Sequence, residues 1–272
     1  MNNLIPHPEL AQDELCVILV KHTNNAKIRK IFNKINKYAK QTSRSDNIIT
    51  SDDDTFAVIA RRLIKDGEPL GKVGGIDLVN WKSNTLSQRS KNLTTLSALY
   101  TSAETILKDK NYSSKVLPNK EELEIAYQKV ADFWRTSLSR IDVFKQYLSL
   151  TREDRPVSGL REDNLLMKPV TQMALAHVEL FADRHGLAWE SIVEKLNQIN
   201  WRFDNSMWFN ILVIGSANKK MITGKESIRS AGAVITYMVM GEHMSRSEVA
   251  DVKQIIQNAR NEENAGLPPR VM

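Results

Sequence analysis

Several protein classes are excluded by what this sequence has little of. Cys16 is the one cysteine among 272 residues, which rules out a disulfide within the chain and a metal site built on cysteines. The 11 glycines and 8 prolines are too few for a disordered or loop-rich chain. No run approaches the ~20 apolar residues that span a membrane, and residues 1–10 lack the features of a signal peptide. We therefore expect a globular, cytoplasmic protein with no membrane partner.

Motifs for nucleotide binding and catalysis are also missing. Gly71-Lys72 and Gly224-Lys225 resemble the end of a phosphate-binding loop. The glycine required five residues earlier is replaced by Asp66 in the first and Lys219 in the second. The histidines have no metal-ligand spacing with Asp, Glu or Cys, and no nucleophile-elbow or Ser/His/Asp signature occurs. We expect no enzymatic activity, no metal and no cofactor.

Positive charge is what the chain has in excess, and it is concentrated in one segment. The net charge is +6, yet the window from Lys21 to Arg44 alone holds eight Lys or Arg and no acidic residue. Because cations at this density neutralise phosphates and release counterions, the window favours binding to nucleic acid or another polyanion. The competing interpretation is the solvated face of an amphipathic helix.

Hydrophobic periodicity predicts a mainly α fold, a helical bundle-like domain with a small N-terminal α/β segment. Residues 15–20 are typical of a short buried strand, and 25–39 of a helix with an apolar face opposite its lysines. Ser51 is the expected N-cap of the next helix. Further helices are expected at 52–66, 90–108, 121–138, 141–150, 165–185, 189–198, 227–240 and 245–259. The end of the chain, from Asn261, is expected to be loose.

A polar linker at 109–120 is the best candidate for a domain boundary. It is rich in Asn, Ser and Lys. It would separate an α/β segment carrying the basic helix, residues 1–110, from a C-terminal helical domain, residues 120–272. Any strands are expected near the N-terminus.

Eleven basic residues are the candidate DNA contacts. A second basic spot follows the loop at 215–218, where a turn entering a helix can present backbone N–H groups to a phosphate. Solvated lysines in a polar loop explain that spot equally well. The segment from Trp201 to Trp208 either stacks on bases or packs in the core. The candidate DNA-binding residues are Lys27, Arg29, Lys30, Lys34, Lys37, Lys40, Arg44, Arg89, Lys219, Lys220 and Arg229.

Three blocks of the sequence stand out by their order and spacing. The first is Ile28–Asn36 with Lys40–Ser45 and Phe56–Arg61, the second is Asn84–Tyr100, and the third is Asn200–Trp208 with Ala217–Lys220. Together they resemble the DndB family of DNA sulfur modification proteins, whose members carry a DGQHR motif. The resemblance spans roughly Leu15 to Ile256.

The resemblance implies a role in the bacterial systems that place sulfur on the DNA backbone as a phosphorothioate. It implies a DNA-binding regulator that controls transcription of the modification genes, with DNA and other phosphorothioation proteins as partners. It also implies that the N-terminal α/β segment is a ParB-like remnant. The DGQHR motif itself is absent, so we expect a truncated or split family member, and no catalytic residue carries over.

Two other classes of function stay open, as does homo-oligomerisation. An ATPase or nuclease of the ParB-like class, needing the missing DGQHR segment, would have its site in the loop 67–75 or around His177. Alternatively, the chain binds other modification proteins without contacting DNA. Met238, Met240 and Met244 are the candidate surface for that role, unless they pack in the core.

Overall fold

The structure is a computed structural model of the 272-residue chain, and it describes Asn24, Lys27 and residues 43–215 and 219–271. The chain divides into two compact units, Met1–Thr42 and Ser43–Met272. The predicted strand at 15–20 and most of the predicted basic helix at 25–39 lie outside the described residues. Lys27 is described: it is exposed and helical, and its backbone N–H donates to Asn24 Oδ1 at 2.8 Å.

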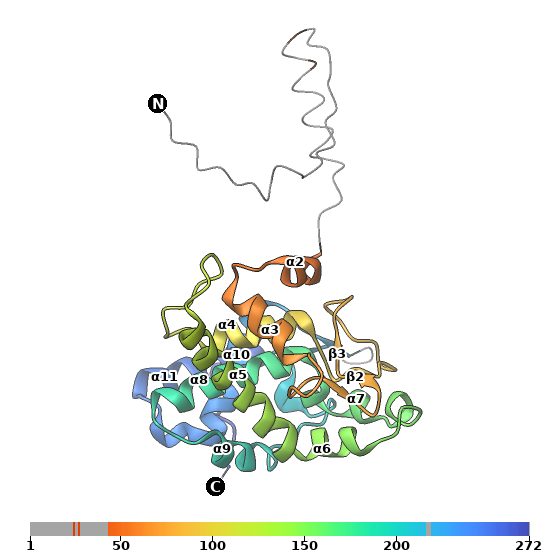
Figure 1. Cartoon of the computed structure of the whole chain (residues 1–272). Coiled ribbons are helices and arrows are strands. Elements are labelled where there is room, and N and C mark those ends of the chain that lie inside the picture. Colours follow the sequence, from red (N-terminus) through yellow and green to blue (C-terminus); the bar gives the residue numbers. More distant parts are fainter. Residues whose placement is uncertain (1–23, 25–26, 28–42, 216–218, 272) are drawn as a thin grey trace, which may run out of the picture. The chain divides into compact units, whose positions relative to one another are not determined.

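The second unit is mainly α-helical, which confirms the predicted fold class (Figure 1). Its short 3₁₀ turns are η2 (Arg155–Val157), η3 (Leu165–Met167), η4 (Ser206–Trp208) and η5 (Gly241–His243). Its α-helices are α2 (Arg44–Thr50), α3 (Thr55–Leu63), α4 (Leu96–Ile106), α5 (Lys120–Arg140), α6 (Asp142–Ser149), α7 (Leu160–Asp163), α8 (Pro169–Arg184), α9 (Trp189–Leu196), α10 (Lys225–Met240) and α11 (Arg246–Arg260).

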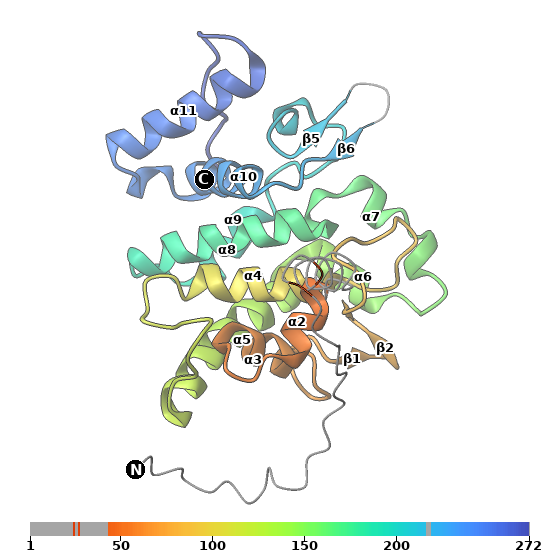
Figure 2. The same ribbon diagram turned by 90° about the horizontal axis from the view of Figure 1, so that it is seen from above.

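Helix α8 is the centre of this unit and lies between α4 and α10 (Figure 2). Pro169 is its first residue, so α8 begins after the predicted start at 165, whereas Gly186, at φ +66°, follows its end as predicted. Gly232 of α10 lets the two backbones approach, since a Cβ there would lie 2.7 Å from His177 Cβ. Neighbours on both sides explain why α8 is buried around most of its circumference.

Strands are few and short in the part of the chain that the structure describes. β1 (Lys72–Val73) pairs antiparallel with β2 (Ile76–Asp77), and β3 (Val79–Asn80) pairs parallel with β4 (Thr94–Thr95). β5 (Val213–Ile214) and β6 (Lys220–Met221) form a third, antiparallel pair. The prediction that all strands lie near the N-terminus is therefore wrong. Two-residue strands are too short to show a period in the sequence.

The start of α3 differs from the prediction. Its N-cap is Asp54, whose Oδ1 accepts from the N–H groups of Phe56 and Ala57 at 2.9 and 3.1 Å. Tyr100 of α4 donates to the other oxygen of Asp54 at 2.8 Å, so a tertiary contact selects this residue. Ser51, the expected N-cap, instead ends α2, whose N-cap Ser43 forms a capping box with Asp46.

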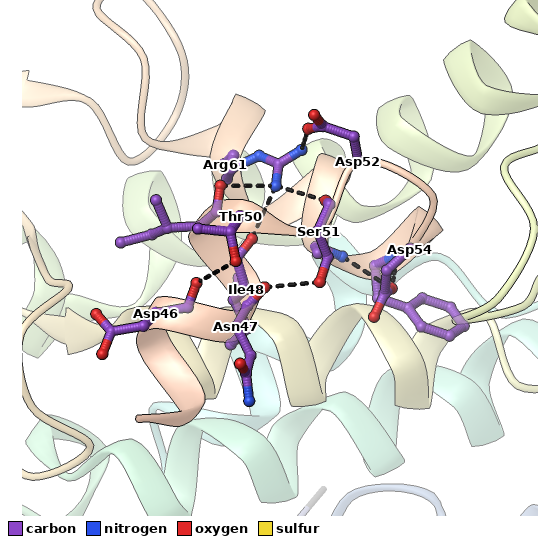
Figure 3. Close-up of polar contacts among 11 residues, drawn as sticks. Asp46, Asn47, Ile48, Thr50, Ser51, Asp52, Asp54 and Arg61 are labelled. Atoms are coloured by element: carbon purple, nitrogen blue, oxygen red, sulfur yellow. Dashed lines mark hydrogen bonds and ion pairs between the residues drawn. The ribbon is translucent and has the colours of Figure 1, made fainter. Parts of the chain in front are cut away.

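Arg61 of α3 fixes the corner between α2 and α3 (Figure 3). Its Nη1 donates to the carbonyl oxygens of Ile48, Ile49 and Ser51 at 2.9, 3.0 and 2.5 Å. Its Nη2 bonds Asp52 at 2.8 Å. Because the last carbonyls of a helix lack partners within it, one guanidinium satisfies the end of α2 and holds it on α3.

Residues before and after the predicted linker share one hydrophobic core. Helices α3 and α4, which precede residues 109–120, pack with α5 and α8, which follow it. The domain division at 110–120 stays a prediction. Met238 and Met240 belong to this core, at 4% and 1% exposed, so they do not form the surface considered for partner proteins.

The C-terminal tail packs on the fold, contrary to the expectation that it is loose. The N–H of Val271 donates to the carbonyl of Met238 at 2.8 Å, and Ala265 is 3% exposed. A few small and apolar residues suffice to dock the segment, although its composition is polar. None of the helices that the structure describes is both long and apolar enough to cross a bilayer.

Candidate nucleic-acid interface

Four basic residues from separate parts of the chain line two adjoining cavities, which we call the cationic groove. One cavity, of 590 Å³, is lined by Lys168, Lys219 and Lys220. The other, of 410 Å³, is lined by Arg44 and again by Lys168. Lys168 and Met221 border both, so the two cavities are continuous. The groove brings together three of the predicted DNA contacts and adds Lys168, which nothing in the sequence distinguishes from other surface lysines.

Arg44 is positioned by α2 and by the α4 helix beneath it. Its Nη2 donates to Thr101 Oγ1 at 2.8 Å, and its guanidinium carbon lies 5.4 Å from the centroid of the Tyr100 ring. The side chain is exposed and makes no ion pair with a carboxylate among residues 43–215 and 219–271. Its charge is therefore held in place but not neutralised.

Lys168 stands immediately before the first residue of α8. Its Nζ lies 5.1 Å from the centroid of the Phe203 ring, and the residue is half-buried. Burial, with a smaller effect of the Arg161 charge, lowers the pKa of Lys168 to about 8, against the opposing influence of Glu162 and Asp163. A cation that is already partly dehydrated costs less to bring against an anion.

Lys219 and Lys220 are placed by the β5–β6 pair. Ile214 pairs with Lys220 and Val213 with Met221, which brings the lysines beside the groove. Lys219 Nζ also lies 5.3 Å from the centroid of the Phe209 ring. The second basic spot of the sequence therefore contributes to the groove through its first two residues.

The other predicted contacts lie elsewhere. Arg229 is exposed on α10 and does not line the groove, and its charge acts on His177 of α8. Arg89 is exposed and lines a third cavity, of 310 Å³, together with Arg155 and Arg161; we call this cavity the arginine pocket. Gln88 and Glu162 line both this pocket and the groove, so the pocket adjoins the groove. Arg29, Lys30, Lys34, Lys37 and Lys40 lie outside the described residues.

The tryptophans considered for base stacking are in the core. Trp201 and Trp208 are 5% and 0% exposed and stack on each other, with centroids 5.1 Å apart and planes 9° from parallel. Their indole N–H groups donate to the carbonyls of Leu196 and Asn200. Core packing therefore accounts for the aromatic segment.

The two regions considered as enzyme sites are a hairpin turn and a stretch of α8. The segment 67–75 contains β1 and the turn of the β1–β2 hairpin, where Gly74 and Gly75 have positive φ. Burial lowers the pKa of His177 to about 4, and Glu179 of the same helix pairs with Lys129 at 3.2 Å. No cluster of three or more His, Cys, Asp or Glu suited to a metal occurs among the described residues.

Comparison with known proteins matches this chain to a family. A family model described as DndB, DNA-sulfur modification-associated, matches residues 2–241. No curated protein and no solved structure matches the chain. The matched range includes the basic window, the cationic groove and the arginine pocket, and it ends at Gly241, directly after α10.

Proposed function

The chain belongs to the DndB family of DNA-sulfur modification-associated proteins, and on that premise we propose that it is a DNA-binding regulator of a bacterial phosphorothioate modification system. It acts by binding DNA and controlling transcription of the modification genes, without chemistry of its own. The cationic groove carries this proposal. Its four cations come from distant parts of the chain, and none pairs with a carboxylate among the described residues.

The groove suits the sugar-phosphate backbone of DNA on electrostatic grounds. Each phosphate neutralised by a Lys or Arg releases counterions, which drives binding in a salt-dependent way. The N-terminal end of α8 lines the groove through Pro169 and Val170, and the helix dipole adds partial positive charge there. Contacts of this kind position a protein on DNA but carry no sequence information.

The basic segment at 25–39 is part of the same proposal. Lys27, Lys30, Lys34 and Lys37 would contact phosphates on the side of that helix opposite its apolar residues. Other proteins of the modification system are further proposed partners, and we assign no surface to them.

The test compares two double variants that lose the same charge. K219A/K220A removes two lysines of the groove, and K115A/K253A removes two exposed lysines that do not line it. Titration onto duplex DNA at several salt concentrations should show weaker binding for the groove variant, with the log–log salt slope flatter by about two. Equal affinity and slope for both variants would remove the groove from the interface.

A further inference from the structure

The arginine pocket contains two buried guanidiniums without acidic partners. Arg155 and Arg161 are 3% and 4% exposed, and neither forms an ion pair among the described residues. Both guanidinium carbons lie near the ring of Tyr147, at 5.2 and 5.7 Å from its centroid. Arg89 adds a third, exposed guanidinium to the same 310 Å³ cavity.

The hydrogen-bonding capacity of these groups is also unfilled. Nε and Nη1 of Arg155 have no acceptor, and its Nη2 makes a long bond to the carbonyl of Leu148 at 3.4 Å. Arg161 donates to the carbonyls of Met167 and Asn92, but its Nε has no acceptor. Buried donors of this kind are costly unless something supplies the missing acceptor.

Stability alone does not account for this arrangement. Burial lowers the pKa of both arginines, which shows that the surroundings disfavour their charge. An apolar residue of similar volume would avoid this cost, because unpaired buried charge destabilises a fold. Two such residues lining one cavity indicate an anion that compensates both when it binds.

We propose that the arginine pocket binds the tetrahedral oxyanion of a phosphate group. Guanidinium forks match the oxygens of phosphate, and Arg89, Arg155 and Arg161 all line one cavity, which is large enough for a phosphate and its substituent. Glu162 also lines the pocket, but it is exposed and its charge acts on Lys168. The phosphate comes either from a small molecule or from the DNA backbone, and only the second source rests on the proposed function.

Thermal unfolding of the full chain in sodium phosphate, against sodium chloride at equal ionic strength, tests the pocket. Phosphate at about ten times its dissociation constant should raise Tm by about 3 °C. R155M should lose this rise and, without phosphate, unfold no earlier than the unmodified chain, because it no longer buries a charge. R152M changes an exposed arginine three residues away that does not line the pocket, and it should keep the rise.

Arg89→Gln keeps the test decisive if R155M does not fold. Arg89 is exposed, so its loss leaves the core intact, and the phosphate-dependent rise in Tm should shrink. The inference is overturned if phosphate has no effect beyond chloride on the unmodified chain. It is equally overturned if R89Q and every folded Arg155 variant keep the full rise.

Duplex DNA, titrated with and without saturating phosphate, separates the two sources. If phosphate weakens DNA binding in the unmodified chain but not in R89Q, the pocket takes a backbone phosphate. If neither phosphate nor the R89Q substitution changes DNA binding, the pocket binds a small phosphate compound. If DNA does not bind while the rise in Tm persists, the proposed function fails and the phosphate site stands.

Discussion

Replacing Arg61 with methionine should loosen α2 and with it the position of Arg44. The substitution removes three hydrogen bonds to carbonyls at the end of α2, and an ion pair with Asp52. Asp52 is 94% exposed, so the ion pair contributes under about 1 kcal/mol. The carbonyls can partly rehydrate, and we expect a total loss of about 1–3 kcal/mol in the free energy of unfolding.

Urea unfolding measures this loss, and D52N is the matched control. D52N removes the ion pair alone and should cost less than about 0.5 kcal/mol. R61K keeps the charge but lacks the fork that reaches several carbonyls, and should fall between the two. If R61M costs no more than D52N, the carbonyl contacts do not hold the corner. DNA affinity of R61M should also fall, because Arg44 starts the helix that Arg61 holds.

Three further predictions concern charge. DNA binding at fixed ionic strength should weaken from pH 7 to pH 9, because Lys168, with a pKa of about 8, loses its proton; K168R should flatten this dependence, and an unchanged profile would contradict it. Burial raises the pKa of Glu179 to about 7, above its unfolded value, so its ionisation lowers stability as pH rises from about 4.5 to 7. K129M removes its ion pair and should therefore lose more stability at pH 8 than at pH 5, measured by urea unfolding; E179Q in the same background should abolish that difference, and equal losses would refute the account. A quadruple variant that replaces Lys27, Lys30, Lys34 and Lys37 with alanine should keep the Tm of the unmodified chain, bind DNA more weakly and show a flatter salt slope. Unchanged affinity and slope would mean that these lysines form only a solvated surface.

The sequence predicted those elements whose limits are set locally. Gly186 marks the end of α8, and the long periodic runs of α5 and α10 lie within a few residues of the predicted ranges. The predicted start of α8 at 165 is too early, because residues 165–167 form the separate turn η3 and the helix begins at Pro169. The predicted start of α4 at Ser90 is too early, because Thr94 and Thr95 pair with β3 before Thr95 caps the helix. Ser51 and Asp54 are both good N-caps, and only the contact with α4 distinguishes them.

The candidate site was predictable in residue type but not in arrangement. Arg44, Lys219 and Lys220 were expected to bind DNA, yet nothing in the sequence brings residues so far apart to one groove. Lys168 and Arg155 were missed, because in sequence a buried cation is indistinguishable from a solvated one. Only the packing around them shows that their charges are dehydrated and unpaired.

The docked tail has a consequence for anyone who shortens this protein. The family match ends at Gly241, but α11 packs on α10, and Val271 bonds back to Met238. A version trimmed to the matched residues would remove the segment that lies on Met238, which is 4% exposed when the tail is present. Newly exposed apolar surface of this kind promotes self-association. The last residue matched by the family is therefore not a suitable truncation point for this protein.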